Sequence, residues 1–348
     1  MKKGKAAYLL GKRKFVIDEC EVPDCRDDEV LIRIKAVGVC GSDAHYFLDG
    51  RIGDQIVPEK FIIGHEACGE IVETGKNVRS VKKGDRVVIE PGISCGICEF
   101  CITGRPNLCP NVKFLGTPPV TGAFREFICM PEKNVVKLPD QLSFAQGTLA
   151  EPLAIALYGV RLSNLLVGDS VAILGAGPIG LSVLFCCKTG GASQISVTEI
   201  VEERAYMAKN LGADYVYLAN KQDIVREIFS HTEDRGVDIC FECAGKQETV
   251  DQMIQVCSIG GRAVIFGIPA EDRISFDPHL VRRKQLPIFS VRRSAFTTKM
   301  ALDFMCNSNI KFTSIITHRF PLEKIQDALE LVSSKSDGVI KAIVDVSV

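Results

Sequence analysis

The chain has 348 residues, 46% of them hydrophobic, and a formal net charge of -1. This composition is typical of a globular protein, the length predicts two domains, and so small a charge argues against nucleic acid or an anionic membrane as a partner. No apolar run reaches the length of a membrane span, and the one near the N-terminus is too short for a signal peptide. We therefore expect a cytoplasmic protein that acts on a small molecule.

Residues 1–152 carry short apolar runs such as EVLIRIKAVGV, separated by turn signals such as KKGD. Runs of this length that are rich in Val and Ile predict strands, and the Gly and Asp between them predict turns. We expect these residues to form a β-rich domain.

Three separate stretches of this region offer side chains suited to a catalytic metal site. The candidates are Cys40, Ser42, Asp43, His45 and Tyr46 in GVCGSDAHY, His65 and Glu66 in IIGHEACGEIVETG, and Glu151 in LAEPLAIAL. One thiolate, one imidazole and one carboxylate suit a catalytic zinc that keeps a position open for water or substrate. A capped turn and a buried, hydrogen-bonded His65 explain the same residues without a metal. We expect Gly64 and Gly69 to form turns beside the His-Glu pair, and Cys68 to serve packing.

The fifteen cysteines are not expected to form a disulfide framework in a cytosolic chain. Four of them follow the spacing C-x2-C-x2-C-x7-C, namely Cys95, Cys98, Cys101 and Cys109. Four thiolates among Gly and Pro residues favour a closed, structural zinc site, with an iron-sulfur cluster or unpaired thiols as the alternatives. Others sit among apolar neighbours and behave as small hydrophobes: Cys186, Cys187, Cys240, Cys243, Cys257 and Cys306.

Residues 153–288 alternate short apolar strands with helical patterns, which predicts βαβ units and a parallel sheet. VAILGAGPIGLSVL places Gly175, Gly177 and Gly180 as G-x-G-x-x-G between a strand and a helix, and Glu199 ends the next strand. This context predicts a dinucleotide site in which Glu199 favours NAD over NADP, against the alternative of a glycine turn in an unrelated α/β protein. Arg204 either flanks the adenosine or is an exposed helix arginine. The remaining residues, 289–348, predict two helices and the closing strand KAIVDV.

Nearly the whole chain resembles the zinc-dependent medium-chain dehydrogenases, and within them the polyol branch of sorbitol and xylitol dehydrogenases. The resemblance rests on GVCGSDAHYFLDGRIG, IIGHEACGEIVETG, the four-cysteine stretch, FLGTPPVTGAF, EPLAIAL, GAGPIG, DRGVDICFECAG and THRFPLEKIQDALE. It implies an α/β fold: a GroES-like β-rich catalytic domain, completed by the C-terminal segment, plus an inserted Rossmann domain with a doubly wound parallel sheet. It also implies an active site in the cleft between them, and a homotetramer or homodimer.

The resemblance also assigns roles to individual residues. Cys40, His65 and Glu66 fall on the catalytic zinc ligands, and Glu151 falls on a contact to the zinc-bound water or the substrate. Ser42 and His45 fall on a proton relay, Asp43 on a partner that orients His65, and Tyr46 on a substrate contact. The cofactor-contacting positions are Gly175, Gly177, Pro178, Ile179, Gly180, Glu199, Arg204, Gly267, Ile268, Val291 and Arg292.

One position departs from the polyol pattern, because Arg293 replaces a tyrosine beside the substrate arginine, Arg292. The resemblance implies an L-iditol 2-dehydrogenase-like enzyme with catalytic and structural zinc, which oxidises a secondary alcohol of a polyol to a ketose with NAD. If Arg293 faces the pocket, an anionic sugar alcohol becomes the alternative substrate. A simple-alcohol dehydrogenase and a non-catalytic NAD-binding protein of the same fold are the remaining hypotheses.

Overall fold

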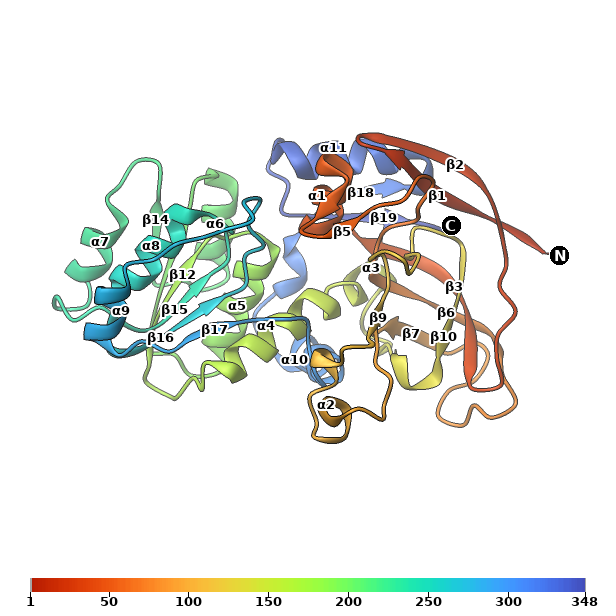
Figure 1. Cartoon of the computed structure of the whole chain (residues 1–348), viewed down its shortest axis with the longest axis horizontal. Coiled ribbons are helices and arrows are strands. Elements are labelled where there is room, and N and C mark those ends of the chain that lie inside the picture. The colour runs from red at the N-terminus through yellow and green to blue at the C-terminus, as the bar shows by residue number, and fades with distance from the viewer. Residues whose placement is uncertain (1, 348) are drawn as a thin grey trace. The chain divides into compact units, whose positions relative to one another are not determined.

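The computed structural model describes residues 2–347 and separates the chain into two units (Figure 1). Unit 1 combines the chain up to Glu151 with Thr298–Asn307 and the chain from Ile316 onward. Unit 2 combines Pro152–Thr297 with Ser308–Ile315. Residues 289–297, which we expected in the C-terminal segment, belong to unit 2 because strand β17 (Ile288–Ser290) pairs with the sheet of that unit.

Unit 1 is built on a seven-stranded sheet in which β3 (Glu29–Gly38) pairs with β6 (Glu66–Thr74), β10 (Phe127–Pro131) and β19 (Lys341–Asp345). The sheet continues through β7 (Arg86–Ile89), β11 (Val135–Lys137) and β18 (Ile316–Pro321). Three separate strand pairs are β1 (Lys3–Gly11) with β2 (Lys14–Glu21), β4 (Arg51–Ile52) with β5 (Gln55–Ile56), and β8 (Gly92–Ile93) with β9 (Lys113–Phe114). The Val and Ile residues of β3 are buried, as expected for a central strand.

The helices of unit 1 are short. They are α1 (Gly41–Asp49), α2 (Glu99–Ile102), α3 (Phe144–Gly147), α10 (Thr298–Asn307) and α11 (Ile325–Ser334), with 3-10 turns η1 (Pro106–Leu108), η2 (Glu132–Asn134) and η4 (Leu322–Lys324). Helix α4 (Ala150–Leu162) begins with the last residues of the N-terminal part of unit 1.

The strand register brings three strand ends to one edge of the unit 1 sheet. Gly38, the last residue of β3, lies opposite Glu66, the first residue of β6. Gly38 also lies opposite Ile343 in β19, the strand that begins at Lys341. Because both neighbours run antiparallel to β3, their first residues and the chain that leaves β3 meet at the same place.

Unit 2 contains a six-stranded parallel sheet in the order β14-β13-β12-β15-β16-β17. Numbered within the unit this is 3-2-1-4-5-6, the order of the doubly wound dinucleotide-binding fold, which reverses between β12 and β15. The strands are β12 (Ser170–Leu174), β13 (Gln194–Glu199), β14 (Tyr215–Leu218), β15 (Val237–Glu242), β16 (Cys257–Ile265) and β17. Strand β12 is fully buried, and β15 is buried at every residue except the half-buried Asp238, as the continuous apolar runs predicted.

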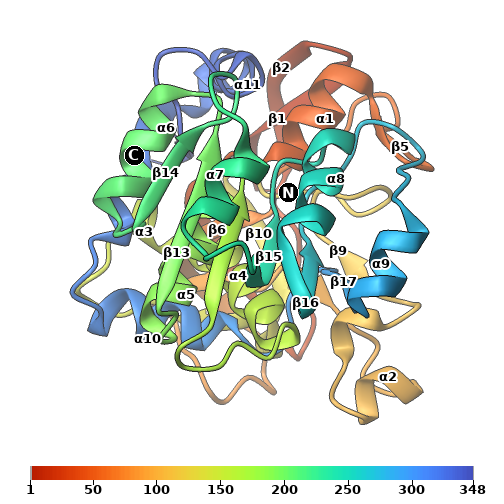
Figure 2. The same cartoon turned by 90° about the vertical axis from the view of Figure 1, so that its left-hand side faces the viewer.

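Helices pack against both faces of this sheet, and Figure 2 turns the unit toward the viewer. Helices α5 (Pro178–Thr189) and α6 (Glu202–Asn210) contact β12, β13 and β14. Helix α8 (Gln247–Val256) contacts α7 (Ile224–Ser230) and α9 (Pro278–Lys284). Helix α8 also contacts β15 and β16, α9 contacts β16, and η3 (Phe312–Ile315) packs against α5.

Within residues 2–347 no helix is long and apolar enough to cross a bilayer.

Cys25 and Cys129 form a disulfide, which the sequence did not predict. The pairing of β10 with β3 places Cys129 opposite Leu31, close to the segment that contains Cys25. The other cysteines that the structure describes are free.

Candidate functional site

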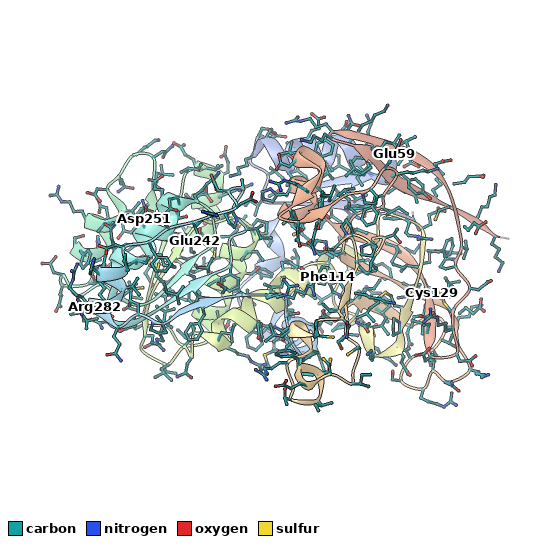
Figure 3. All side chains as sticks on the ribbon, in the orientation of Figure 1. Glu59, Phe114, Cys129, Glu242, Asp251 and Arg282 are labelled. Carbon is teal, nitrogen blue, oxygen red and sulfur yellow. A yellow bond between two sulfur atoms is a disulfide. The ribbon has the colours of Figure 1, made fainter. Side chains whose placement is uncertain are left out.

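The strand ends of unit 1 gather one thiol, one imidazole and one carboxylate. The ligand atoms of Cys40, His65 and Glu66 all lie within 4.8 Å of one another. His65 and Glu66 are buried and Cys40 is half-buried. The ring centroids of His65 and Phe114 are 5.5 Å apart. Figure 3 labels Phe114. This is a compact N, O and S donor set of the kind that binds a transition metal.

Asp43 connects the chain segment that carries Cys40 to the segment that carries Gly64 and His65. Its carboxylate accepts hydrogen bonds from the Cys40 N–H (3.0 Å) and the Gly64 N–H (3.2 Å), and its Oδ1 lies 3.6 Å from His65 Nδ1. Asp43 is fully buried. Burial opposes the charge on His65, but Cys40 and Asp43 raise its pKa well above the usual range.

Both glycines beside the His-Glu pair were expected in turns. Gly64 lies in irregular chain with φ +94, and a Cβ there would meet the Phe124 ring at 2.6 Å, so this position requires glycine. Gly69 lies inside β6 rather than in a turn, and a Cβ there would overlap the Arg33 carbonyl. Cys68 is fully buried in the same strand and lies outside the ligand group, and burial raises the pKa of its thiol.

A buried lysine accompanies Glu66. Lys341 is 1% exposed, forms an ion pair with Glu66, and donates a hydrogen bond to the Val39 carbonyl (3.0 Å). Burial opposes the charge on Lys341, but Glu66 and Cys40 raise its pKa. Gly38 lacks a side chain where the pair lies, because a Cβ there would overlap the Glu66 carboxylate.

Glu151 lies in the first turn of α4, outside the set of three atoms described above. It is buried, and its Oε2 accepts no hydrogen bond from residues 2–347. Burial raises the pKa of Glu151 to about 8, and the Glu66 and Glu90 carboxylates act in the same direction. Glu151 is therefore close enough to the metal-binding group to interact with it electrostatically.

Helix α1 carries the residues predicted for the proton relay. Ser42 and His45 are three residues apart, so they are neighbours on the helix surface. The His45 side chain is 30% exposed, and its Nδ1 lies 3.6 Å from the exposed Asp49. Tyr46 is 3% exposed within the core of unit 1, with its hydroxyl 3.4 Å from Gln55 Oε1. Its role as a substrate contact stays a prediction.

The four clustered cysteines also converge. The sulfurs of Cys98 and Cys101 are 3.4 Å apart, those of Cys95 and Cys109 are 3.5 Å apart, and all four lie within 4.8 Å of one another. Backbone N–H groups of Ile97 and Cys98 lower the pKa of Cys95 to about 6. Four sulfurs in this arrangement suit a tetrahedral, coordinatively closed metal site.

The glycine loop of unit 2 joins β12 to α5. Gly175 has φ +104, and a Cβ on Gly180 would overlap the Gly175 carbonyl, so both positions require glycine. A Cβ on Gly177 would meet only the Arg204 guanidinium, at 3.9 Å, so the N-terminus of α5 is open to an approaching phosphate. Pro178 and Ile179 form the first turn of the helix.

Glu199 and Arg204 lie beside this loop. The Glu199 carboxylate accepts hydrogen bonds from the Ala176 N–H (2.8 Å) and from the N–H groups of Ile200 and Val201. Arg204 is 8% exposed, so the alternative of an exposed helix arginine is wrong. Burial lowers the pKa of Arg204, and Glu199 opposes that shift.

The other predicted cofactor and substrate positions follow β16 and β17. Gly267 packs against Gly245, and the side chain of Ile268 is 47% exposed. Val291 donates its N–H to the Ile265 carbonyl (2.9 Å). Arg292 is exposed, while Arg293 is half-buried with φ +57.

Two buried charged residues were missed by sequence reasoning: Lys341 and, in unit 2, Glu242. Lys341 had a usable signal, because it is a lone lysine at the start of the apolar run KAIVDV, which pairs into a central position of the sheet. Glu242 ends the apolar strand VDICFE in the same manner. A charged residue at the end of a buried apolar strand is a usable signal, since such residues are rarely buried without a partner.

Comparisons with known proteins agree with this geometry. Residues 26–140 match the alcohol dehydrogenase GroES-like domain, and residues 178–306 match the zinc-binding dehydrogenase family. The sorbitol dehydrogenase of Bacillus subtilis (strain 168) is 38% identical over 98% of this chain and 96% of its own. The L-idonate 5-dehydrogenase of Vitis vinifera is 34% identical over 97% of this chain and 93% of its own.

A solved structure of another protein has the same fold. The Escherichia coli oxidoreductase of unknown specificity that is described as involved in membrane biogenesis superimposes with a TM-score of 0.95 at 35% identity, over 100% of both chains. The predicted fold class, a GroES-like domain plus a Rossmann domain, is confirmed.

Proposed function

Because the chain belongs to the zinc-dependent medium-chain dehydrogenase family, in its polyol branch, we propose that it oxidises a secondary alcohol of a sorbitol- or xylitol-like polyol to a ketose, with hydride transfer to NAD. The observation that carries this proposal is the group formed by half-buried Cys40 and buried His65 and Glu66, whose ligand atoms lie within 4.8 Å of one another. An L-iditol 2-dehydrogenase-like activity is the specific form that we propose. The cytoplasmic location and the homotetramer or homodimer stay predictions.

The donor set fits a catalytic zinc. Cys40, His65 and Glu66 would hold the ion, and the unbonded Oε2 of Glu151 is available to a water or a substrate hydroxyl. When bound, zinc supplies Lewis acidity, which lowers the pKa of a coordinated hydroxyl group toward neutrality. Asp43 supports the site by accepting hydrogen bonds from the backbone beside Cys40 and His65, so these ligands are oriented before the ion binds.

The proton released from the alcohol needs a path to solvent. Ser42 would accept it at its hydroxyl and His45 would receive it at a ring nitrogen, since the two residues are neighbours on α1. His45 is partly exposed beside Asp49, so it can release the proton to water. A nicotinamide cofactor, when bound, would supply the hydride acceptor for the carbon-bound hydrogen of the alcohol, so the product would be a ketone.

The cofactor proposal rests on unit 2. Glu199 Oε2 accepts one hydrogen bond, from Ala176, which leaves it capacity for a ribose hydroxyl. A buried carboxylate at this position would repel a 2'-phosphate, so we propose NAD rather than NADP. The pyrophosphate would approach Gly177 and the N-terminus of α5.

A substrate panel tests the proposal directly. NADH formation is followed with sorbitol, xylitol, a sugar acid, a phosphorylated polyol and a simple secondary alcohol. We expect the neutral polyols to give the highest kcat/KM with NAD. Zinc-loaded protein that turns over none of these alcohols would contradict the enzyme assignment.

A second candidate, an anionic sugar alcohol, is favoured by Arg293, where the polyol pattern has a tyrosine. A planar guanidinium binds carboxylate and phosphate groups well, and one relative is named L-idonate 5-dehydrogenase. In the same panel Arg293→Tyr distinguishes the two candidates. It raises KM for the anionic compounds alone if they are the substrates, and otherwise changes KM for all compounds alike.

The four-cysteine group is proposed to bind a structural zinc. Cys98→Ser is expected to reduce the zinc content from about two to about one per chain and to lower the melting temperature, while the folded fraction still binds NADH. Metal analysis and a thermal melt check both effects. Cys306→Ser, outside the group, is the matched control and should keep both zinc ions. A Cys98→Ser protein with unchanged zinc content refutes the assignment.

A further inference from the structure

Glu242 is a fully buried carboxylate at the end of β15, beside the point where the strand order of unit 2 reverses (Figure 3). It lies opposite Leu174, the last residue of β12 before the glycine loop, and opposite Ile265, the last residue of β16. Ligands of open α/β sheets bind outside the carboxyl ends of the strands at this reversal. Glu242 therefore lies in the part of unit 2 where such folds receive a cofactor. It falls within the stretch DRGVDICFECAG, but the glycine motif that predicted the dinucleotide site does not include it.

One oxygen of Glu242 organises the chain that follows it. Oε1 accepts hydrogen bonds from the Ala244 N–H (2.8 Å), the Gly245 N–H (2.7 Å) and the Thr249 hydroxyl (2.8 Å). Thr249 lies in the first turn of α8. A single charged acceptor thus fixes both the loop after β15 and the start of the next helix, and hydrogen bonds to a charged group are the stronger kind.

The backbone and the second oxygen of Glu242 reach the loop after β16. The Glu242 carbonyl accepts from the N–H groups of Phe266 (2.8 Å) and Gly267 (3.2 Å). A Cβ on Gly267 would overlap both the Gly245 N–H and Glu242 Oε2. The two loops are therefore in direct backbone contact, with the carboxylate against them.

The glycine loop touches the same assembly. Cys243 donates its N–H to the Leu174 carbonyl (2.9 Å), and a Cβ on Gly175 would lie 3.2 Å from Ala244. The loops that follow β12, β15 and β16 are thus held together around Glu242. Glu199 fixes the glycine loop in the same way from the other side, through Ala176.

We propose that Glu242 is a positioning residue for the nicotinamide cofactor, which holds the loops after β12, β15 and β16 in the arrangement that binds it. This inference rests on the proposed NAD-dependent function. All three hydrogen bonds to Oε1 come from the loop and helix start at this edge of the sheet, so loss of the carboxylate is expected to disturb the cofactor side of unit 2 first. The role is indirect, because the carboxylate acts through the loops.

The test is the Kd of NADH for the full chain, measured by fluorescence well below the melting temperature. Glu242→Ala is expected to raise Kd by about tenfold, since it leaves two loop N–H groups without their acceptor. Glu242→Gln keeps an acceptor oxygen and should stay within about threefold of wild type. Thr249→Val removes one of the three bonds and should raise Kd by about threefold, which provides a second variant if Glu242→Ala does not fold.

Ile228→Ala is the matched control, because it removes a fully buried side chain of unit 2 in α7 and should lower the melting temperature without changing Kd. With Glu242→Ala, KM for NAD should rise while KM for the polyol does not. A Kd for Glu242→Ala or Thr249→Val equal to that of Ile228→Ala overturns the inference alone. Wild-type protein that does not bind NADH overturns the proposed function together with it.

Discussion

The His65→Ala variant is expected to lose polyol turnover by at least about a thousandfold and to bind NADH within about twofold of wild type. Alanine removes the imidazole from a group that offers three ligand atoms, and Cys40 and Glu66 remain. The loss should be this large because each unit of pKa that the metal removes from the substrate hydroxyl is worth a factor of ten. NADH affinity is retained because the glycine loop belongs to unit 2 and His65 belongs to unit 1.

Zinc analysis, NADH fluorescence and turnover on one preparation check this result. His279→Ala is the matched control, since it removes an exposed histidine from α9 and should change none of the three. A His65→Ala enzyme with full turnover refutes the role of His65. Loss of NADH binding in parallel with turnover would indicate general misfolding rather than a missing ligand.

In metal-free protein, the Lys341→Met variant is expected to be destabilised by about 3–5 kcal/mol, because it leaves the Glu66 carboxylate buried without its charge partner. It should also lose the hydrogen bond to Val39 that ties β19 to the chain leaving β3. Urea denaturation gives the free energy of unfolding. Lys299→Met removes an exposed lysine and should change that free energy by no more than about 0.5 kcal/mol.

A double-mutant cycle distinguishes a lost charge partner from lost packing. Glu66→Gln combined with Lys341→Met removes both charges and should recover part of the stability that Lys341→Met loses. If Lys341→Met and the double variant are destabilised equally, the ion pair with Glu66 is not the source of the stability that Lys341 provides. Glu66→Gln should in addition lower the zinc content, whatever its effect on stability.

The features that could be predicted from sequence are those whose residues lie close together along the chain at a characteristic spacing. The cysteines from Cys95 to Cys109 and the glycines from Gly175 to Gly180 each lie within one loop, so their geometry follows from nearby residues. The alternation of strands and helices likewise predicted the parallel sheet of unit 2. The resemblance to a family added the link between Cys40 and His65, which spacing alone left open.

The remaining features depend on contacts between residues far apart in the sequence. Lys341 contacts Glu66 only because β19 and β6 both pair with β3. Cys25 contacts Cys129 only because β10, which carries Cys129, also pairs with β3. Gly69 was expected in a turn because glycine usually marks one, whereas it serves close packing of two strands. Arg204 is buried near Glu199 and Gly177, and helix periodicity does not report such contacts.

The pairing of Glu66 with Lys341 affects the order in which the two units can fold during synthesis. The ribosome synthesises Glu66 early and Lys341 late, and all of unit 2 emerges between them. During that interval β6 cannot bury its first carboxylate against a cation, whereas the main part of unit 2 is continuous and can fold as a domain as it emerges. Unit 1 is therefore expected to reach its final form last, when β19 joins β3 and completes the site.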